Sequence, residues 1–168
     1  MSFSRISEKI LRKITNYLNP NGSGLYIRDL DDDLVVAYPD EKGYINKLIE
    51  LLSLDKGAGN RHFGKKIYTY LNKSGAEEIF MVDGDVTTAN CKVNMQRKIC
   101  DAYFSYLLPE FKQLVKDYPD NEEYKDALDW LEINYSSVES MFESKEFYFR
   151  AGFISGFGIY KDDDFGDL

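Results

Sequence analysis

The sequence is short of cysteine, histidine and long apolar runs, and each shortage removes a class of protein. Two cysteines, Cys91 and Cys100, are too few for a disulfide framework and have no partners at zinc-ligand spacing. We therefore expect reduced thiols in a cytoplasmic protein and no metal site. A single histidine, His62, rules out mechanisms that need a histidine pair. No apolar run reaches the roughly eighteen residues of a membrane-spanning helix, and no signal core follows Met1, so we expect no membrane partner.

Positive charge is also scarce, because 29 acidic side chains face 21 basic ones and the formal net charge is −8. Residues 1–84 carry 12 side chains of each sign, whereas residues 85–168 carry 9 basic and 17 acidic ones. A negative protein repels phosphate backbones and anionic bilayers, so we predict no nucleic-acid partner. An anionic ligand is better placed in the first half.

The size and the abundance of aromatic residues indicate a folded chain. The 168 residues suit one hydrophobic core, and 25 of them are aromatic, far more than in disordered chains. We predict a single domain over residues 1–168 that ends in an acidic tail at residues 162–168.

Apolar residues recur at helical spacing in about five stretches. The pattern predicts helices near residues 6–18, 45–52, 63–71, 95–118 and 124–142. Pro109 is expected to break or kink the fourth of these helices. Asp120 is expected to cap the last one, with Glu123 completing a capping box.

Three further apolar runs predict strands at residues 25–27, 79–86 and 146–160. Asp83-Gly84 inside the second run is either a hairpin turn or a bulge, and we favour one long strand. In the third run, one face at a period of two is formed by Phe147, Phe149, Ala151, Phe153 and Ser155. The predicted class is α/β, with a small three-stranded mixed sheet and about five helices.

The densest charge follows the first predicted strand, in residues 28–33 (RDLDDD). Ligands of open α/β sheets bind beyond the carboxyl ends of strands, so this segment is the first candidate site. As a calcium loop it lacks the central glycine and the final glutamate, where Leu34 and Asp40 stand.

Two other interpretations of this segment stay open. The pattern Asp-x-Asp after a strand resembles the haloacid-dehalogenase motif, with Asp29 as nucleophile and Asp31 as acid and base. That motif continues with a small residue and a threonine, which this chain lacks. A solvated acidic turn is the remaining interpretation.

The order of motifs resembles the class I S-adenosylmethionine-dependent methyltransferases over nearly the whole chain. The turn Asn-Pro-Asn-Gly at residues 19–22, then LYIRDLDDDL and AYPD, is similar to the stretch that feeds the family's fifth strand. Residues 60–79 (NRHFGKKIYTYLNKSGAEEI) are similar to the stretch before the sixth strand. Residues 147–161 (FYFRAGFISGFGIYK) are similar to the last strand. The agreement in series, rather than any one motif, carries the resemblance.

The resemblance implies a partial Rossmann-like methyltransferase fold in which the last strand inserts antiparallel between the other two. The glycine-rich loop that binds the family's cofactor would lie upstream of Met1, and Gly57-Ala58-Gly59 follows a predicted helix rather than a strand. We therefore expect a substrate-side half that binds no S-adenosylmethionine alone and methylates a small molecule only when completed. An open strand edge at Gly24–Arg28 predicts a homodimer or a separately encoded amino-terminal half.

The resemblance also places two groups of residues on the side of the acceptor substrate: Arg28, Asp29, Asp31 and Asp32, and Asn60, Arg61 and His62. His62 is a candidate general base, but no catalytic residue is assigned. The competing functions are a non-catalytic dimeric interaction protein derived from a methyltransferase and, less favoured, an Asp-dependent phosphatase.

Overall fold

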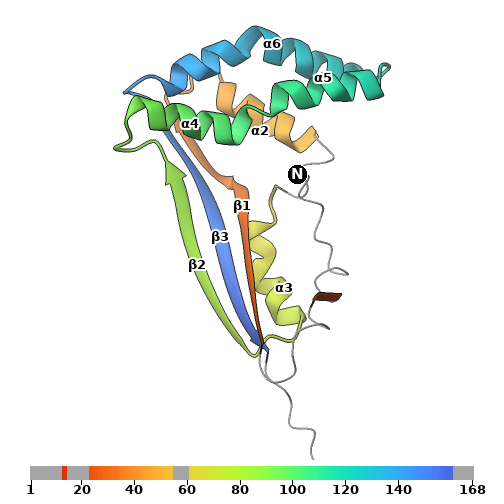
Figure 1. Ribbon diagram of the computed structural model, residues 1–168, viewed down its shortest axis with the longest axis vertical. Helices are drawn as coiled ribbons and strands as arrows, with labels where there is room; N and C mark the ends of the chain where they lie inside the picture. Colours follow the sequence, from red (N-terminus) through yellow and green to blue (C-terminus); the bar gives the residue numbers. More distant parts are fainter. Residues whose placement is uncertain (1–12, 15–22, 55–60, 161–168) are drawn as a thin grey trace, which may run out of the picture. The chain divides into compact units, whose positions relative to one another are not determined.

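The computed structural model describes residues 13–14, 23–54 and 61–160 (Figure 1). The elements in chain order are β1 (Ser23–Tyr38), α2 (Tyr44–Leu54), the 3-10 helix η1 (Gly64–Lys66), α3 (Ile67–Lys73), β2 (Glu78–Thr87), α4 (Val93–Phe104), α5 (Leu107–Asp117), α6 (Glu122–Phe142) and β3 (Tyr148–Tyr160). The predicted first helix and the acidic tail lie outside the described residues, apart from Lys13 and Ile14, which are helical. The predicted α/β class is confirmed.

The three strands form one sheet in the order β1-β3-β2. The sheet is antiparallel rather than mixed, because β3 separates β1 from β2, which run in the same direction. β2 continues through Asp83-Gly84, so the prediction of one long strand there is confirmed. The insertion of the last strand between the other two is the order that the resemblance implied.

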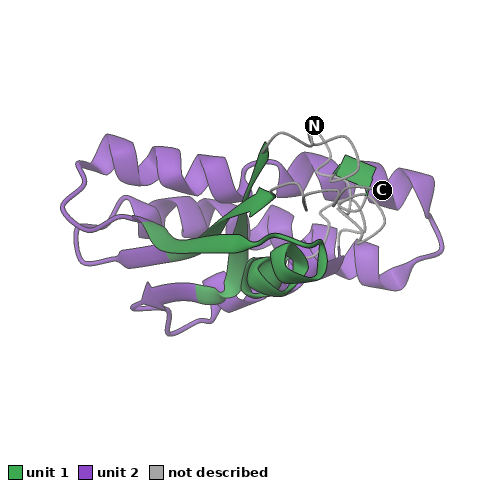
Figure 2. Ribbon diagram, turned by 90° about the horizontal axis from the view of Figure 1, so that it is seen from below, with its two compact units in different colours: residues 1–34, 56–85, 151–168 green, residues 35–55, 86–150 purple. Residues whose placement is uncertain are grey.

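The chain divides into two compact units (Figure 2). Unit 1 comprises residues 1–34, 56–85 and 151–168. Its core forms where Ile67 and Leu71 of α3 pack with Ile27 and Phe63. A Cβ added to Gly156 of β3 would lie 2.5 Å from Ile67 Cγ2. The helix therefore packs directly against the backbone of the strand.

Unit 2 comprises residues 35–55 and 86–150 and contains α2, α4, α5 and α6. Its core is aromatic, with the ring centroids of Phe142 4.9 Å from Phe147 and 5.1 Å from Phe149. Both cysteines are free thiols in this unit. Burial is the main cause that raises the pKa of Cys100 to about 12.

The boundaries of the helices in unit 2 differ from the prediction at two points. The expected helix over 95–118 breaks before Leu107, and Pro109 lies in the first turn of α5, where a helix needs no backbone N–H donor. The cap of α6 is Asn121 rather than Asp120, and its side chain accepts a hydrogen bond from the backbone N–H of Tyr124 at 3.2 Å. Among the described residues, no helix is both long enough and apolar enough to cross a membrane.

Candidate functional site

The acidic segment of β1 bulges out from its partner strand. Three contacts set the register of β1 on β3: Gly24 lies beside Phe157, the Tyr26 hydroxyl donates to Ser155 at 3.0 Å, and the Arg28 guanidinium lies 3.5 Å from the ring centroid of Phe153. Leu34 then lies beside Gly152, the very next position of β3. Residues 29–33 therefore lie between two residues of β1 whose neighbours on β3 are adjacent. These five residues lack partners on β3 and form an enlarged bulge. The interpretation as a solvated acidic turn after a short strand is wrong, because β1 extends from Ser23 to Tyr38 and the bulge buries Asp31 and Asp32.

Residues 61–65 pack against the bulge. They comprise the three residues before η1 and its first two residues. Asp31 is 1% exposed, and its carboxylate accepts the backbone N–H of Lys65 at 2.9 Å and that of Asp33 at 3.2 Å. A Cβ on Gly64 would lie 3.1 Å from Asp31 Cβ, so the absence of a side chain at Gly64 allows this close approach. Backbone donors thus satisfy a carboxylate that the fold buries.

Asp32 and Arg61 form the strongest polar contact of the site. Arg61 donates from Nε to Oδ2 and from Nη2 to Oδ1 of Asp32, both at 2.9 Å. The Asp32 backbone N–H also donates to the Arg61 carbonyl oxygen at 3.0 Å. The two side chains are only 2% and 16% exposed for Asp32 and Arg61 respectively. A bidentate, largely buried pair of this kind fixes both partners in one orientation.

Asp33, His62 and Lys65 form the outer, solvent-facing part of the site. His62 Nδ1 lies 3.1 Å from Asp33 Oδ1 and 3.8 Å from Asp31 Oδ1. Lys65 pairs with the other oxygen of Asp33, and this hydrogen bond is the main cause that lowers the pKa of Asp33 and raises the pKa of Lys65. Asp31, Asp33 and His62 place one ligand atom each within 4.8 Å, a donor set suited to a cation. The Lys65 ammonium competes with a metal for Asp33.

Of the other predicted site residues, Asp29 borders this cluster, Arg28 contacts β3 instead, and Asn60 is not described. Arg28 is exposed and stacks on Phe153. Asp29 is half-buried, and its carboxylate accepts the backbone N–H of Leu30 at 2.9 Å. Burial is the main cause that raises the pKa of Asp29, opposed by the hydrogen bond from Leu30 and the charge of Arg61. Asn60 lies outside the described residues.

The structure thus brings Asp31, Asp32, Arg61 and His62 together and adds two residues that the predicted substrate groups lacked. Asp33 belongs to the same acidic run, and Lys65 to the basic pair at the start of the next helix. Their charges were visible in the sequence, but their pairing was not. The calcium-loop interpretation does not fit, because residues 29–38 belong to the strand β1 and do not form a twelve-residue loop.

No protein-family model matches the chain, and no curated protein shows significant similarity to it. In the described part of the chain, no glycine-rich turn leads from a strand into a helix. The connection from β1 to α2 has one glycine, Gly43, and the connection from β2 to α4 has none. The described residues therefore do not form the kind of glycine-rich loop that binds S-adenosylmethionine in the family that the sequence resembles.

Proposed function

We propose that this chain is the substrate-side half of an S-adenosylmethionine-dependent methyltransferase that acts on a small molecule, in the cytoplasm, once a partner completes it. The sheet order carries the proposal, because β3 lies between β1 and β2 and is antiparallel to both. The resemblance to the class I methyltransferases implies the same order. The helix α3, which lies between β1 and β2 in the chain, packs on the sheet and adds support.

Within this proposal the residues of the bulge have separate roles. Arg61 and Asp32 are positioning residues, because their buried bidentate pair holds residues 61–65 against β1. His62, whose side chain is 41% exposed, is the group that an acceptor substrate can reach, and Asp31 and Asp33 orient it. An imidazole held by carboxylates can take up a proton from an acceptor.

A calorimetric titration of S-adenosylmethionine tests the proposal. We expect no binding by the chain alone and saturable binding when the product of the gene immediately upstream is added. In that pair, His62→Gln should preserve cofactor binding and lower methyl transfer to the acceptor. Binding by the chain alone would contradict a half-enzyme, and no binding in either sample would favour the interaction protein described next.

The second candidate function is a non-catalytic dimeric interaction protein. The observation that favours it is the mutual pairing of the site's charges, since Asp32 is paired with Arg61 and Asp33 with Lys65. Groups already paired in this way act in structure as readily as in binding. Exposed apolar side chains on the two edge strands, such as Tyr26 at 59% and Val82 at 63%, add a surface suited to a protein partner.

The phosphatase hypothesis has a direct test of its own. Magnesium-dependent hydrolysis of a phosphate monoester, lost on Asp29→Asn, would restore it as the favoured function. We expect no such activity, because Asp29 is half-buried and its carboxylate already accepts a hydrogen bond from Leu30.

A further inference from the structure

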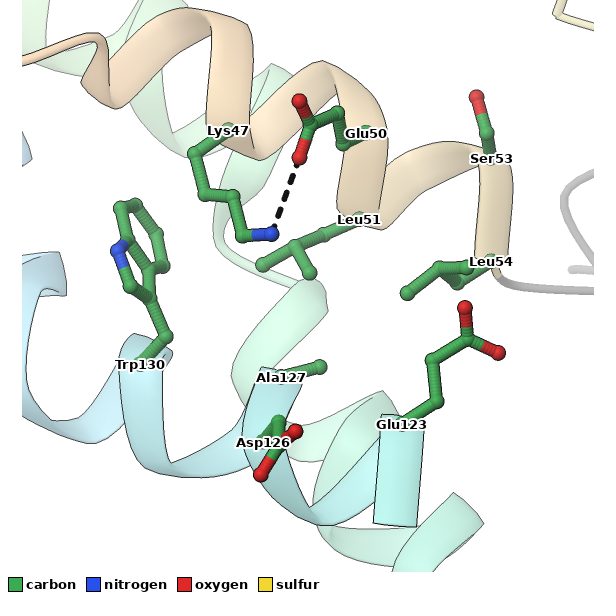
Figure 3. Close-up of a pocket in the computed structure, with 9 residues that line it drawn as sticks. All are labelled: Lys47, Glu50, Leu51, Ser53, Leu54, Glu123, Asp126, Ala127 and Trp130. Carbon is green, nitrogen blue, oxygen red and sulfur yellow. Dashed lines mark hydrogen bonds and ion pairs between the residues drawn. The ribbon is translucent and has the colours of Figure 1, made fainter. Parts of the chain in front are cut away.

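A cavity lies between α2 and α6 within unit 2 (Figure 3), whereas the bulge of β1 belongs to unit 1. It is open to solvent on one side, where exposed side chains such as Glu50 and Glu123 line it, and its volume is about 790 Å³. Figure 3 shows Trp130 at one end and Glu123 at the other, with Leu51 and Ala127 between them. An apolar floor therefore joins an indole ring to a carboxylate.

The charge of the lining is unbalanced. Glu50, Glu123 and Asp126 line the cavity together with one cation, Lys47, whose Nζ lies 3.0 Å from Glu50. Among the residues that the structure describes, neither Glu123 nor Asp126 pairs with a cation. The end of the cavity at Glu123 thus favours a positive group and repels a negative one.

We propose that this cavity binds an organic ammonium with an apolar tail. The ammonium lies beside Glu123, and the tail covers Leu51 and Ala127 and ends against the Trp130 indole. Each part of the ligand meets its chemical complement, because carboxylate attracts the cation while aliphatic and aromatic side chains remove the tail from water. The proposal concerns a site separate from the bulge and does not depend on the methyltransferase proposal.

Trp130 is the chain's single tryptophan and lines the cavity, so tryptophan fluorescence comes from this one indole. We expect hexyltrimethylammonium chloride to cause a saturable change in Trp130 emission, weakened by added salt. Two probes with the same tail serve as comparisons: 1-hexanol should bind more weakly, and hexanoate should not bind. Equal binding of hexanol and the ammonium, or no saturable change with the ammonium, would overturn the proposal.

Two neighbouring glutamates provide a matched pair of variants. Glu123→Gln should weaken binding of hexyltrimethylammonium about two- to fivefold, as expected for a partly exposed ion pair. Glu122→Gln should leave it unchanged, because Glu122 pairs with Lys125 and does not line the cavity. Circular dichroism confirms that both variants fold. Equal effects of the two changes would show that the probe responds only to the general acidity of α6.

Discussion

At the scale of single residues, the negative charge of the buried Asp32 carboxylate is balanced by its ion pair with Arg61. Arg61→Ala removes both hydrogen bonds from Arg61 and leaves that charge inside unit 1. We expect the free energy of unfolding to fall by about 3 kcal/mol, the cost of breaking a buried pair from one side. Urea denaturation followed by circular dichroism measures this change.

Lys65→Ala is the matched comparison, because Lys65 also pairs with an aspartate of the bulge. That ion pair is exposed, with both side chains about half accessible, and the backbone N–H that binds Asp31 is retained. The loss of stability should be much smaller than for Arg61→Ala. Equal losses would mean that burial does not determine the strength of these pairs.

Asp29 makes a separate prediction about pH, because burial raises its pKa in the folded state. The folded chain then holds this proton at a higher pH than the unfolded chain does. The contribution of Asp29 to stability is therefore most favourable at acid pH and is lost as the pH rises through the ordinary and the raised pKa. Above that window the ionised carboxylate destabilises the fold.

Asp29→Asn removes this titration and keeps an oxygen for the N–H of Leu30. We expect the variant to be more stable than the original chain at pH 7, with the difference shrinking as the pH falls toward 3. Unfolding curves at several pH values measure it. A variant that is less stable at pH 7 would show that the ionised Asp29 carboxylate stabilises the fold.

At the scale of elements, α6 shows how a cap is chosen. Two adjacent residues, Asp120 and Asn121, can both cap a helix, and the sequence pattern favours Asp120 because Glu123 follows three residues later. In the structure α6 begins at Glu122, so Asn121 is at the cap position and binds the N–H of Tyr124. The turn before the helix, which the backbone N–H of Asn121 closes by donating to the Tyr118 carbonyl oxygen at 3.1 Å, places Asn121 at the cap. The rings of Tyr118 and Tyr124 lie 5.9 Å apart beside this turn.

Removing this cap should be measurable. Asn121→Ala is expected to lower the free energy of unfolding by about 1 kcal/mol, and Asp120→Ala by clearly less. Thermal unfolding of both variants gives the comparison. A larger effect of Asp120→Ala would return the cap to the residue that the sequence pattern favours.

At the scale of the whole molecule, β1 and β2 are the two edges of the described sheet. An edge strand offers unpaired backbone donors and acceptors to another chain. If the chain pairs with itself through β1, sedimentation at about 50 μM should give twice the chain mass of 19.5 kDa. A chain that sediments at 19.5 kDa alone would exclude the homodimer and leave the separately encoded half as the partner to seek.

Lysine substitutions distinguish the two edges. Tyr26→Lys on β1 should return the mass to that of a single chain, because a charged edge opposes strand pairing. Val82→Lys on β2 is the control, since Val82 is similarly exposed and lies on the opposite edge. Dissociation by Val82→Lys alone would move the interface to β2.

Much of the fold was visible in the sequence because its cause is local. Apolar spacing predicted α2, α3, α6 and the three strands, although β1 is much longer than the predicted strand at 25–27. The period of two in the last run placed five residues on one face, and all of them except Phe153 are buried: Phe147, Phe149, Ala151 and Ser155. The candidate site was predicted in part, since the acidic run and the Arg-His pair were both identified. Their mutual contacts were not predictable, because residues about 30 positions apart meet only when the bulge and η1 are packed together.

The shortage of cysteine, histidine and positive charge excludes classes of protein, but it does not show which residues meet in the fold. The sequence by itself determined the fold class, the positions of the main elements and the excess of acid, because these follow from composition and periodicity. Only the tertiary structure decided that Asp32 pairs with Arg61 and that the acidic side chains between α2 and α6 line a cavity. These features depend on contacts between distant segments, which no local pattern encodes.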